Sequence, residues 1–292
     1  MAQGNTLAAQ APFGTTSRKD NWWAGPLATF LGLSLFIVYA TYAGMNGKYF
    51  EIRAHPADFS GAEVAPYLSP FYAPLIYDAS SPHAWIQAEK PSWWPGWAPF
   101  SSAALILAGP GLFRFTCYYY RKAYYRSFWA DPAACAVGEP RKTYLGENSF
   151  PLIFQNVHRY TMYVATIFLV LLWWDALQAF YWPNETGGHQ LGMGLGTVIM
   201  VINVICLSGF TFGCNSVRHL VGGRADCFSC PMNGNGQSKE LTVVPAYKFW
   251  RISTRFNEYH MQWAWVSLFT VGFTDFYIRM CAMGIIKDLR FF

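Results

Sequence analysis

The chain has 292 residues and a net charge of +5, and it is 53% hydrophobic, 19% aromatic and only 13% charged. A soluble domain carries about a quarter charged residues, so this composition excludes an ordinary soluble enzyme and indicates a membrane protein. The positive charge does not indicate nucleic-acid binding, because no basic stripe alternates with aromatic side chains outside the apolar segments.

Five apolar segments are each long enough to cross a bilayer as a helix, which takes about 20 residues. They occupy residues 22–45, 97–120, 152–180, 191–214 and 261–283. Trp and Tyr cluster at their ends, as expected of side chains at the membrane–water interface. We therefore predict an all-α polytopic membrane protein, in which residues 1–292 form one domain with five transmembrane helices in a bundle.

The connections between these segments predict the orientation. Residues 46–96 form a long loop rich in Pro and aromatic residues, which indicates a folded extracytoplasmic cap, while residues 121–151 and 215–260 form loops on the opposite side. That opposite side, which includes the N-terminus, carries 15 of the 21 Lys and Arg residues. Because basic loops stay in the cytoplasm, we expect the N-terminus inside and the C-terminus outside.

Thiols and imidazoles gather on the predicted cytoplasmic side. Threading the five helices alternately through the membrane brings seven such residues to that side: Cys117, His158, Cys214, His219, Cys227, Cys230 and His260. Thiols facing the cytoplasm do not argue for disulfides. Ionisable groups at membrane depth are functional by default, so the pattern predicts a metal or redox centre.

Spacing leaves two ligand sets open. One takes a residue from each of four helices, namely Cys117, His158, Cys214 and His260. The other pairs Cys227 and Cys230 with His219 and either His158 or His260. Two Cys with two His suit a Rieske-type [2Fe-2S] centre, four thiolates suit zinc or a cubane cluster, and two histidines on facing helices suit haem b.

Several motifs resemble a known family. They are Phe115-Thr-Cys117 with the following run to Arg126, Gln155-Asn-Val-His158-Arg159, Cys214-Asn-Ser-Val-Arg218-His219 and His260-Met-Gln-Trp. Together they resemble the single-chain membrane anchor of a bacterial succinate dehydrogenase group. The resemblance implies a plasma-membrane subunit with a Rieske-type cluster near a quinone site. It also implies that the chain binds a flavoprotein subunit and an iron–sulfur subunit on its cytoplasmic face.

A quinone pocket is expected at the cytoplasmic edge of the membrane. Its candidate residues are Tyr118, Tyr119, Arg121 and Arg218, although Tyr in the aromatic belt and Arg reaching toward lipid headgroups give the same pattern. Menaquinone and ubiquinone both fit. The basic inner loops suit an acidic soluble subunit or membrane lipids. A higher oligomer of the complex is possible.

Succinate oxidation itself belongs to a partner. The glycine run at residues 192–196 opens a membrane helix and follows no strand, so it is no dinucleotide-binding fingerprint; it predicts close contact between the third and fourth helices instead. The function expected is electron relay from the iron–sulfur subunit to quinone. A haem b-binding quinone-reactive anchor and a cofactor-free docking anchor are the alternatives.

Overall fold

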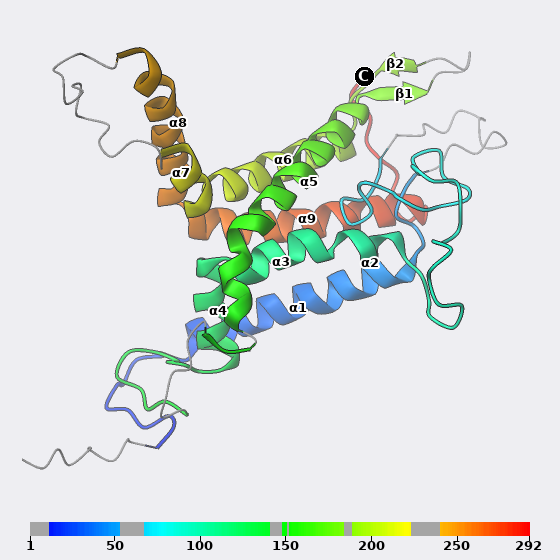
Figure 1. The fold of residues 1–292 in the computed structure, drawn as a ribbon. Coiled ribbons are helices and arrows are strands. Elements are labelled where there is room, and N and C mark those ends of the chain that lie inside the picture. The colour runs from blue at the N-terminus through cyan, green and yellow to red at the C-terminus, as the bar shows by residue number, and fades with distance from the viewer. Residues whose placement is uncertain (1–11, 53–66, 141–147, 151, 184–188, 223–239) are drawn as a thin grey trace, which may run out of the picture.

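A computed structural model describes residues 12–52, 67–140, 148–150, 152–183, 189–222 and 240–292 of the chain. The described chain is mostly helical (Figure 1). Its elements are α1 (Ala24–Asn46), α2 (Ser102–Ile106), α3 (Ala108–Thr116), α4 (Tyr118–Phe128), a 3-10 helix (Leu152–Val157), α5 (His158–Gln178), β1 (Tyr181–Pro183), β2 (His189–Leu191), α6 (Leu195–Phe212), α7 (Asn215–Gly222), α8 (Glu240–Glu258) and α9 (His260–Ala282). The strands β1 and β2 form a small antiparallel hairpin in this otherwise helical protein.

The helices form a bundle with two distinct ends (Figure 1). Helix α9 packs against α6 and α1, and α5 packs against α3 and α6. At the end that we call the α4 end, α3 and α6 finish and α5 and α9 begin. At the opposite end, the cap end, α1 finishes and buried side chains of the following loop, such as Tyr72 and Leu75, pack onto the helices.

Three helices among the described residues are long and apolar enough to cross a membrane: Ala24–Asn46, Leu152–Gln178 and Leu195–Phe212. These three helices support the prediction that the chain is a membrane protein. The number of five membrane-spanning helices stays a prediction. Helix α9 is 23 residues long but carries Asp275 and Arg279, which lower its apolar character. The fourth predicted span begins later than residue 191, because Leu191 belongs to the β-hairpin.

The second predicted span is wrong as one continuous helix. The segment 97–120 is divided into α2, α3 and the start of α4. Pro110 has no N–H to donate to the carbonyl of Ile106, so the helix is disturbed between α2 and α3. Cys117 has extended backbone dihedrals, with ψ at 132°, and it therefore separates α3 from α4. This second break places the thiol of Cys117 at a turn.

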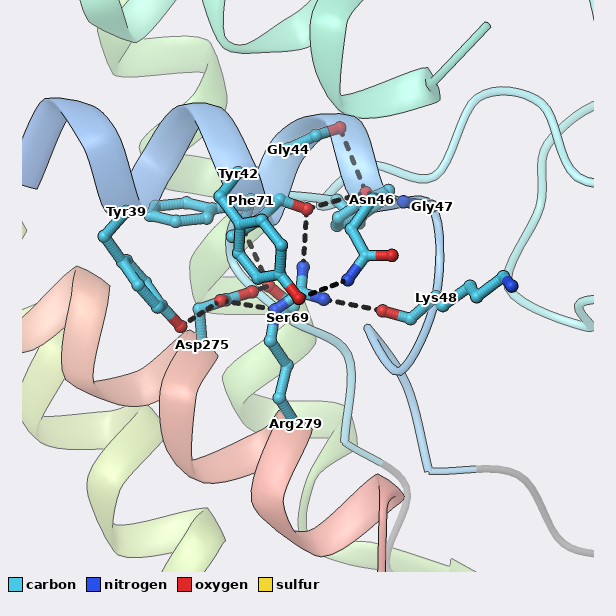
Figure 2. A network of polar contacts seen from close by, with 12 residues as sticks. Tyr39, Tyr42, Gly44, Asn46, Gly47, Lys48, Ser69, Phe71, Asp275 and Arg279 are labelled. Atoms are coloured by element: carbon cyan, nitrogen blue, oxygen red, sulfur yellow. Dashed lines mark hydrogen bonds and ion pairs between the residues drawn. The ribbon is translucent and has the colours of Figure 1, made fainter. Parts of the chain in front are cut away.

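A buried ion pair joins α9, α1 and the loop at the cap end (Figure 2). Arg279 Nε lies 2.7 Å from Asp275 Oδ2, and both side chains are almost fully buried. Arg279 also donates to the carbonyl oxygens of Ala43 at 2.7 Å and Lys48 at 2.6 Å. A cation beside the last carbonyls of a helix is favourable, so this arginine anchors the end of α1.

The carboxylate of that pair is equally well satisfied. Tyr39 donates to Asp275 Oδ2 at 2.6 Å, and Ser69 of the loop donates to Asp275 Oδ1. Each charged group therefore has partners, which offsets the desolvation cost of burying an ion pair. The network fixes the loop to the helices (Figure 2).

The glycine run has a different role from the predicted contact between helices. A Cβ atom on Gly196 would lie 2.2 Å from Cε2 of Tyr67, which is a loop residue. The Tyr67 hydroxyl donates to Asp288 Oδ2 at 2.7 Å, and the backbone N–H of Gly196 donates to Asp288 Oδ1 at 3.0 Å. Gly196 thus makes room for the cap and the C-terminal segment rather than for a neighbouring helix.

Candidate metal centre

Four helix ends bring two thiols and two imidazoles together at the α4 end. Cys117 lies at the break between α3 and α4, and His158 is the first residue of α5. Cys214 follows the end of α6, and His260 is the first residue of α9. Both cysteines are 2% exposed. The structure therefore unites the predicted set with one residue from each of four helices.

The four side chains form two Cys–His pairs. Cys117 Sγ lies 3.5 Å from His260 Nε2. Cys214 Sγ lies 3.1 Å from His158 Nε2. Within the described part of the chain, no three Cys, His, Asp or Glu side chains converge on a single point where a metal ion would sit.

A hydroxyl and an aromatic ring orient His158. Its ring stacks on Phe113 with the two planes 3° apart, and its Nδ1 lies 2.8 Å from Thr116 Oγ1. Thr116 donates its own proton to the carbonyl of Leu112 at 2.8 Å. We therefore assign the proton between Thr116 and His158 to Nδ1, which leaves the Nε2 lone pair directed toward Cys214.

The second imidazole has a different environment. His260 stacks on Phe210 with ring centroids 5.0 Å apart. Its Nδ1 is buried and has no hydrogen-bond partner among the described residues. The guanidinium of Arg114 lies 4.6 Å from the centroid of the same Phe210 ring. A cation therefore approaches the Cys–His pairs.

Small residues allow the helix ends to approach. A Cβ atom on Gly213 would lie 2.9 Å from the carbonyl oxygen of Phe256, near the end of α8. A Cβ atom on Gly209 would lie 2.5 Å from Trp263 of α9. Glycine at these two positions lets the end of α6, which Cys214 follows, pack tightly against α8 and α9.

The alternative ligand set is not assembled in the described residues. His219 lies on α7 with an exposed side chain. Cys227 and Cys230 lie outside the described residues. The set that contains these three residues stays a prediction.

The predicted quinone residues lie in three places. Tyr118 is exposed, and the Arg121 guanidinium lies 4.7 Å from the centroid of its ring. Tyr119 accepts a hydrogen bond of 2.6 Å from Trp265 Nε1. Arg218 is on α7, where it donates to Thr254 at 3.1 Å and lies over Trp250. The structure therefore brings Tyr118 and Arg121 together and places Arg218 apart, between α7 and α8.

A nearby groove contains polar residues that the sequence analysis missed. The groove has a volume of about 420 Å³ and is mostly apolar, with walls from α1, α3 and α4 that include Leu33, Ile37 and Phe115. Arg114 and Tyr120 also line it, and Arg114 donates to the Tyr120 hydroxyl at 2.6 Å. A charged residue three positions before Cys117 in an apolar segment was the available signal.

These features define a class: a helical membrane protein with paired thiols and imidazoles at one end of its bundle. The chain belongs to the family described as actinobacterial succinate dehydrogenase subunit SdhC, whose model matches residues 24–284. It is therefore a membrane subunit of a succinate dehydrogenase, which confirms the family that the motifs predicted.

Comparison with solved structures agrees with the family. The chain is similar to one in the "Mycobacterium smegmatis Sdh1 complex in the apo form", with 40% sequence identity, full coverage of both chains and a TM-score of 0.78. No curated protein matches the chain. The likeness therefore extends over the whole length of the chain.

Proposed function

We propose that this chain is the electron-relay anchor of a succinate:quinone oxidoreductase. In this proposal Cys117, His158, Cys214 and His260 hold a Rieske-type [2Fe-2S] cluster, and the chain binds a flavoprotein subunit and an iron–sulfur subunit on its cytoplasmic face. The two buried Cys–His pairs carry the proposal. The similar M. smegmatis chain is part of an Sdh1 complex, which supports assembly with other subunits.

The donor set fits a two-iron cluster better than one metal ion. A structural zinc ion takes four ligands around one point, whereas the four residues form two separate pairs. In a two-iron cluster each iron takes two protein ligands. The pairs are mixed, each joining a Cys to a His. A Rieske-type centre would take His158 and His260 on one iron and Cys117 and Cys214 on the other.

When bound, the cluster would supply one-electron transfer at a potential raised by its histidine ligands. The protein contributes orientation and a dry environment. Thr116 accepts the Nδ1 proton of His158 and fixes that imidazole with Nε2 toward the thiol. Phe113 and Phe210 stack on the two imidazoles, so each ring has little freedom to turn. The buried cysteines are shielded from water.

For the quinone we favour the groove beside Arg114 and Tyr120 over the exposed surface at Tyr118 and Arg121. A quinone is an apolar molecule with two carbonyl oxygens, and such ligands bind in apolar pockets with a few polar groups. The groove offers apolar walls, the Arg114 guanidinium and the Tyr120 hydroxyl. Tyr120 lies three residues after Cys117, so this site adjoins the proposed cluster. Of the predicted residues, Tyr119 is a neighbour of this groove and stays a candidate.

The membrane orientation is part of the same proposal. Five crossings, with the N-terminus in the cytoplasm and the C-terminus outside, put 15 of the 21 basic residues inside. A C-terminal reporter that works only outside the cytoplasm should be active, and the same reporter placed after Ser216 should be silent. Activity of the second fusion would overturn the orientation.

Spectroscopy of the purified complex tests the cofactor. We expect the His158→Ala complex to contain two fewer iron atoms and two fewer acid-labile sulfides than the unmodified complex, as the [2Fe-2S] formula requires. Its electron paramagnetic resonance spectrum should lose a signal with couplings to histidine nitrogen. His219→Ala is the matched control and should keep that signal. A sharp reduced haem band that disappears in His158→Ala would instead establish the haem b alternative, and an unchanged iron content would leave the docking anchor.

A further inference from the structure

Helix α8 leaves the bundle at the α4 end. It runs across the direction of α9 rather than along it (Figure 1). The last residue of α8 is Glu258 and α9 begins at His260, so only Tyr259 separates the two helices. The C-terminal end of α8 is therefore held at the surface of a bundle that spans the membrane.

One face of α8 is fixed to the protein. Ser253 donates to the carbonyl of Phe212 at 2.9 Å, and Asn257 donates to the carbonyl of Gly213 at 2.7 Å. Thr254 accepts a hydrogen bond of 3.1 Å from Arg218 of α7. These contacts set the rotation of α8 about its axis, and so they determine which side chains point away from the protein.

The side chains that point away form an apolar edge and a basic edge. Phe249 is 63% exposed and Ile252 is 53% exposed, and the two lie three residues apart on one side of the helix. Lys248, Arg251 and Arg255 are spaced by three and four residues and are exposed on the adjoining side. Arg255 has an exposed ion pair with Glu258 at 3.6 Å, and Lys248 and Arg251 supply the other positive charges.

We propose that α8 is an interfacial helix that binds anionic phospholipid. Phe249 and Ile252 enter the acyl-chain boundary, and Lys248 and Arg251 contact the headgroups. An apolar edge beside a basic edge is the pattern of helices that lie in the membrane surface, and anionic lipids attract such basic residues. Because only Tyr259 separates α8 from α9, which we propose crosses the membrane, the exposed edges of α8 lie at the height of the lipid headgroups.

Photo-crosslinking in the intact complex tests this assignment. Benzoylphenylalanine replaces Phe249 in one variant and Tyr247 in a matched variant, because residues two apart on a helix point in nearly opposite directions. The complexes are placed in nanodiscs of phosphatidylcholine and phosphatidylglycerol. We expect several-fold more phospholipid adduct at position 249 than at position 247, with phosphatidylglycerol over-represented.

Charge variants test the headgroup preference. The double variant K248Q/R251Q should lower the phosphatidylglycerol preference several-fold, while K19Q/K90Q, which removes two exposed lysines elsewhere, should leave it unchanged. Crosslinking of position 249 to a polypeptide of the complex would overturn the proposal in favour of subunit docking. Equal lipid adducts at positions 249 and 247 would also overturn it. Neither outcome depends on the cofactor that the chain holds.

Discussion

The two ends of the bundle bury polar groups in opposite ways. At the cap end, Asp275 and Arg279 are paired, and hydroxyls and helix carbonyls supply further partners (Figure 2). At the α4 end, His260 Nδ1 is buried with no partner among the described residues, and two thiols face imidazoles rather than a charge. The first arrangement is complete in itself. The second leaves an imidazole nitrogen without a partner, and it contains the four residues that we propose as cluster ligands.

The two ends therefore differ in why their polar side chains are buried: those at the cap end for stability, and those at the α4 end, in our proposal, for function. A buried polar group costs stability unless hydrogen bonds or charges satisfy it, so packing alone gives little reason to bury two imidazoles against two thiols, with one imidazole nitrogen left without a partner. A satisfied ion pair contributes a fixed geometry between α1, α9 and the loop. We therefore expect changes at the α4 end to affect electron transfer and changes at the cap end to affect stability.

The largest expected effect is on electron transfer at the α4 end. Replacing His158 or His260 by Ala should abolish quinone reduction, because each imidazole is a proposed ligand of the cluster. Succinate oxidation with a soluble dye acceptor should continue, since that chemistry belongs to another subunit. The two activities are measured on the same purified complex.

The control for this experiment is His219→Ala, which changes an exposed histidine on α7. It should keep both activities. If His158→Ala keeps full quinone reduction, the ligand assignment is wrong and Cys227 and Cys230 are the next residues to change. A loss of both activities together would indicate a structural role.

At the cap end we expect a loss of stability with normal electron transfer. Arg279→Ala leaves Asp275 buried without its cation, and removing one partner of a buried pair costs about 3–5 kcal/mol. Thermal unfolding of the detergent-solubilised complex should occur at a clearly lower temperature. The double variant D275L/R279M should recover part of the loss because no unpaired charge remains. If the R279A complex unfolds at the same temperature as the unmodified complex, the ion pair has no structural role.

The position of Cys117, His158, Cys214 and His260 at one end of the bundle was predictable from the alternation of apolar segments. The choice of these four over the set with His219, Cys227 and Cys230 was not. Nor was the pairing of the four, since the break at Cys117 depends on local backbone dihedrals that an apolar run does not reveal. The choice of Thr116 as the partner of His158 depends on a contact between α3 and α5. The same limit applies to Arg114 and Tyr120. The sequence places both residues in one predicted helix, but only the structure shows that they line the same groove.

The cap end shows a second limit. Asp275 and Arg279 are four residues apart on one helix, so their pairing was open to prediction. Their contacts with Ser69 and the carbonyl of Ala43 were not, because residues more than 200 positions apart meet there. The glycine run was interpreted as a contact between helices, whereas a loop tyrosine fills the space that Gly196 leaves.

A smaller effect on electron transfer is expected from Thr116→Val. The substitution keeps the shape of the side chain but removes the oxygen that lies 2.8 Å from His158 Nδ1. Loss of such an outer partner of a ligand histidine lowers metal affinity or activity by about 10–100-fold. Quinone reduction and the histidine-nitrogen couplings should both change, and Thr116→Ser should restore them. Normal couplings in the Val variant would show that Thr116 does not orient the imidazole.

The smallest expected effect is at Gly196, and it tests whether the cap is tightly packed. A Cβ atom there would meet Tyr67 at 2.2 Å, so Gly196→Ala forces the ring to move. Overpacking of this kind costs about 1–3 kcal/mol, which should lower the unfolding temperature without changing the ratio of quinone-linked to dye-linked activity. Gly25→Ala is the control, because a Cβ atom at Gly25 meets nothing within 4 Å. In a Tyr67→Ala background Gly196→Ala should no longer lower the unfolding temperature, since the effects of substitutions at contacting residues are not additive. If Gly196→Ala lowers it as much as before, the destabilisation comes from the backbone of α6 and not from the contact with Tyr67.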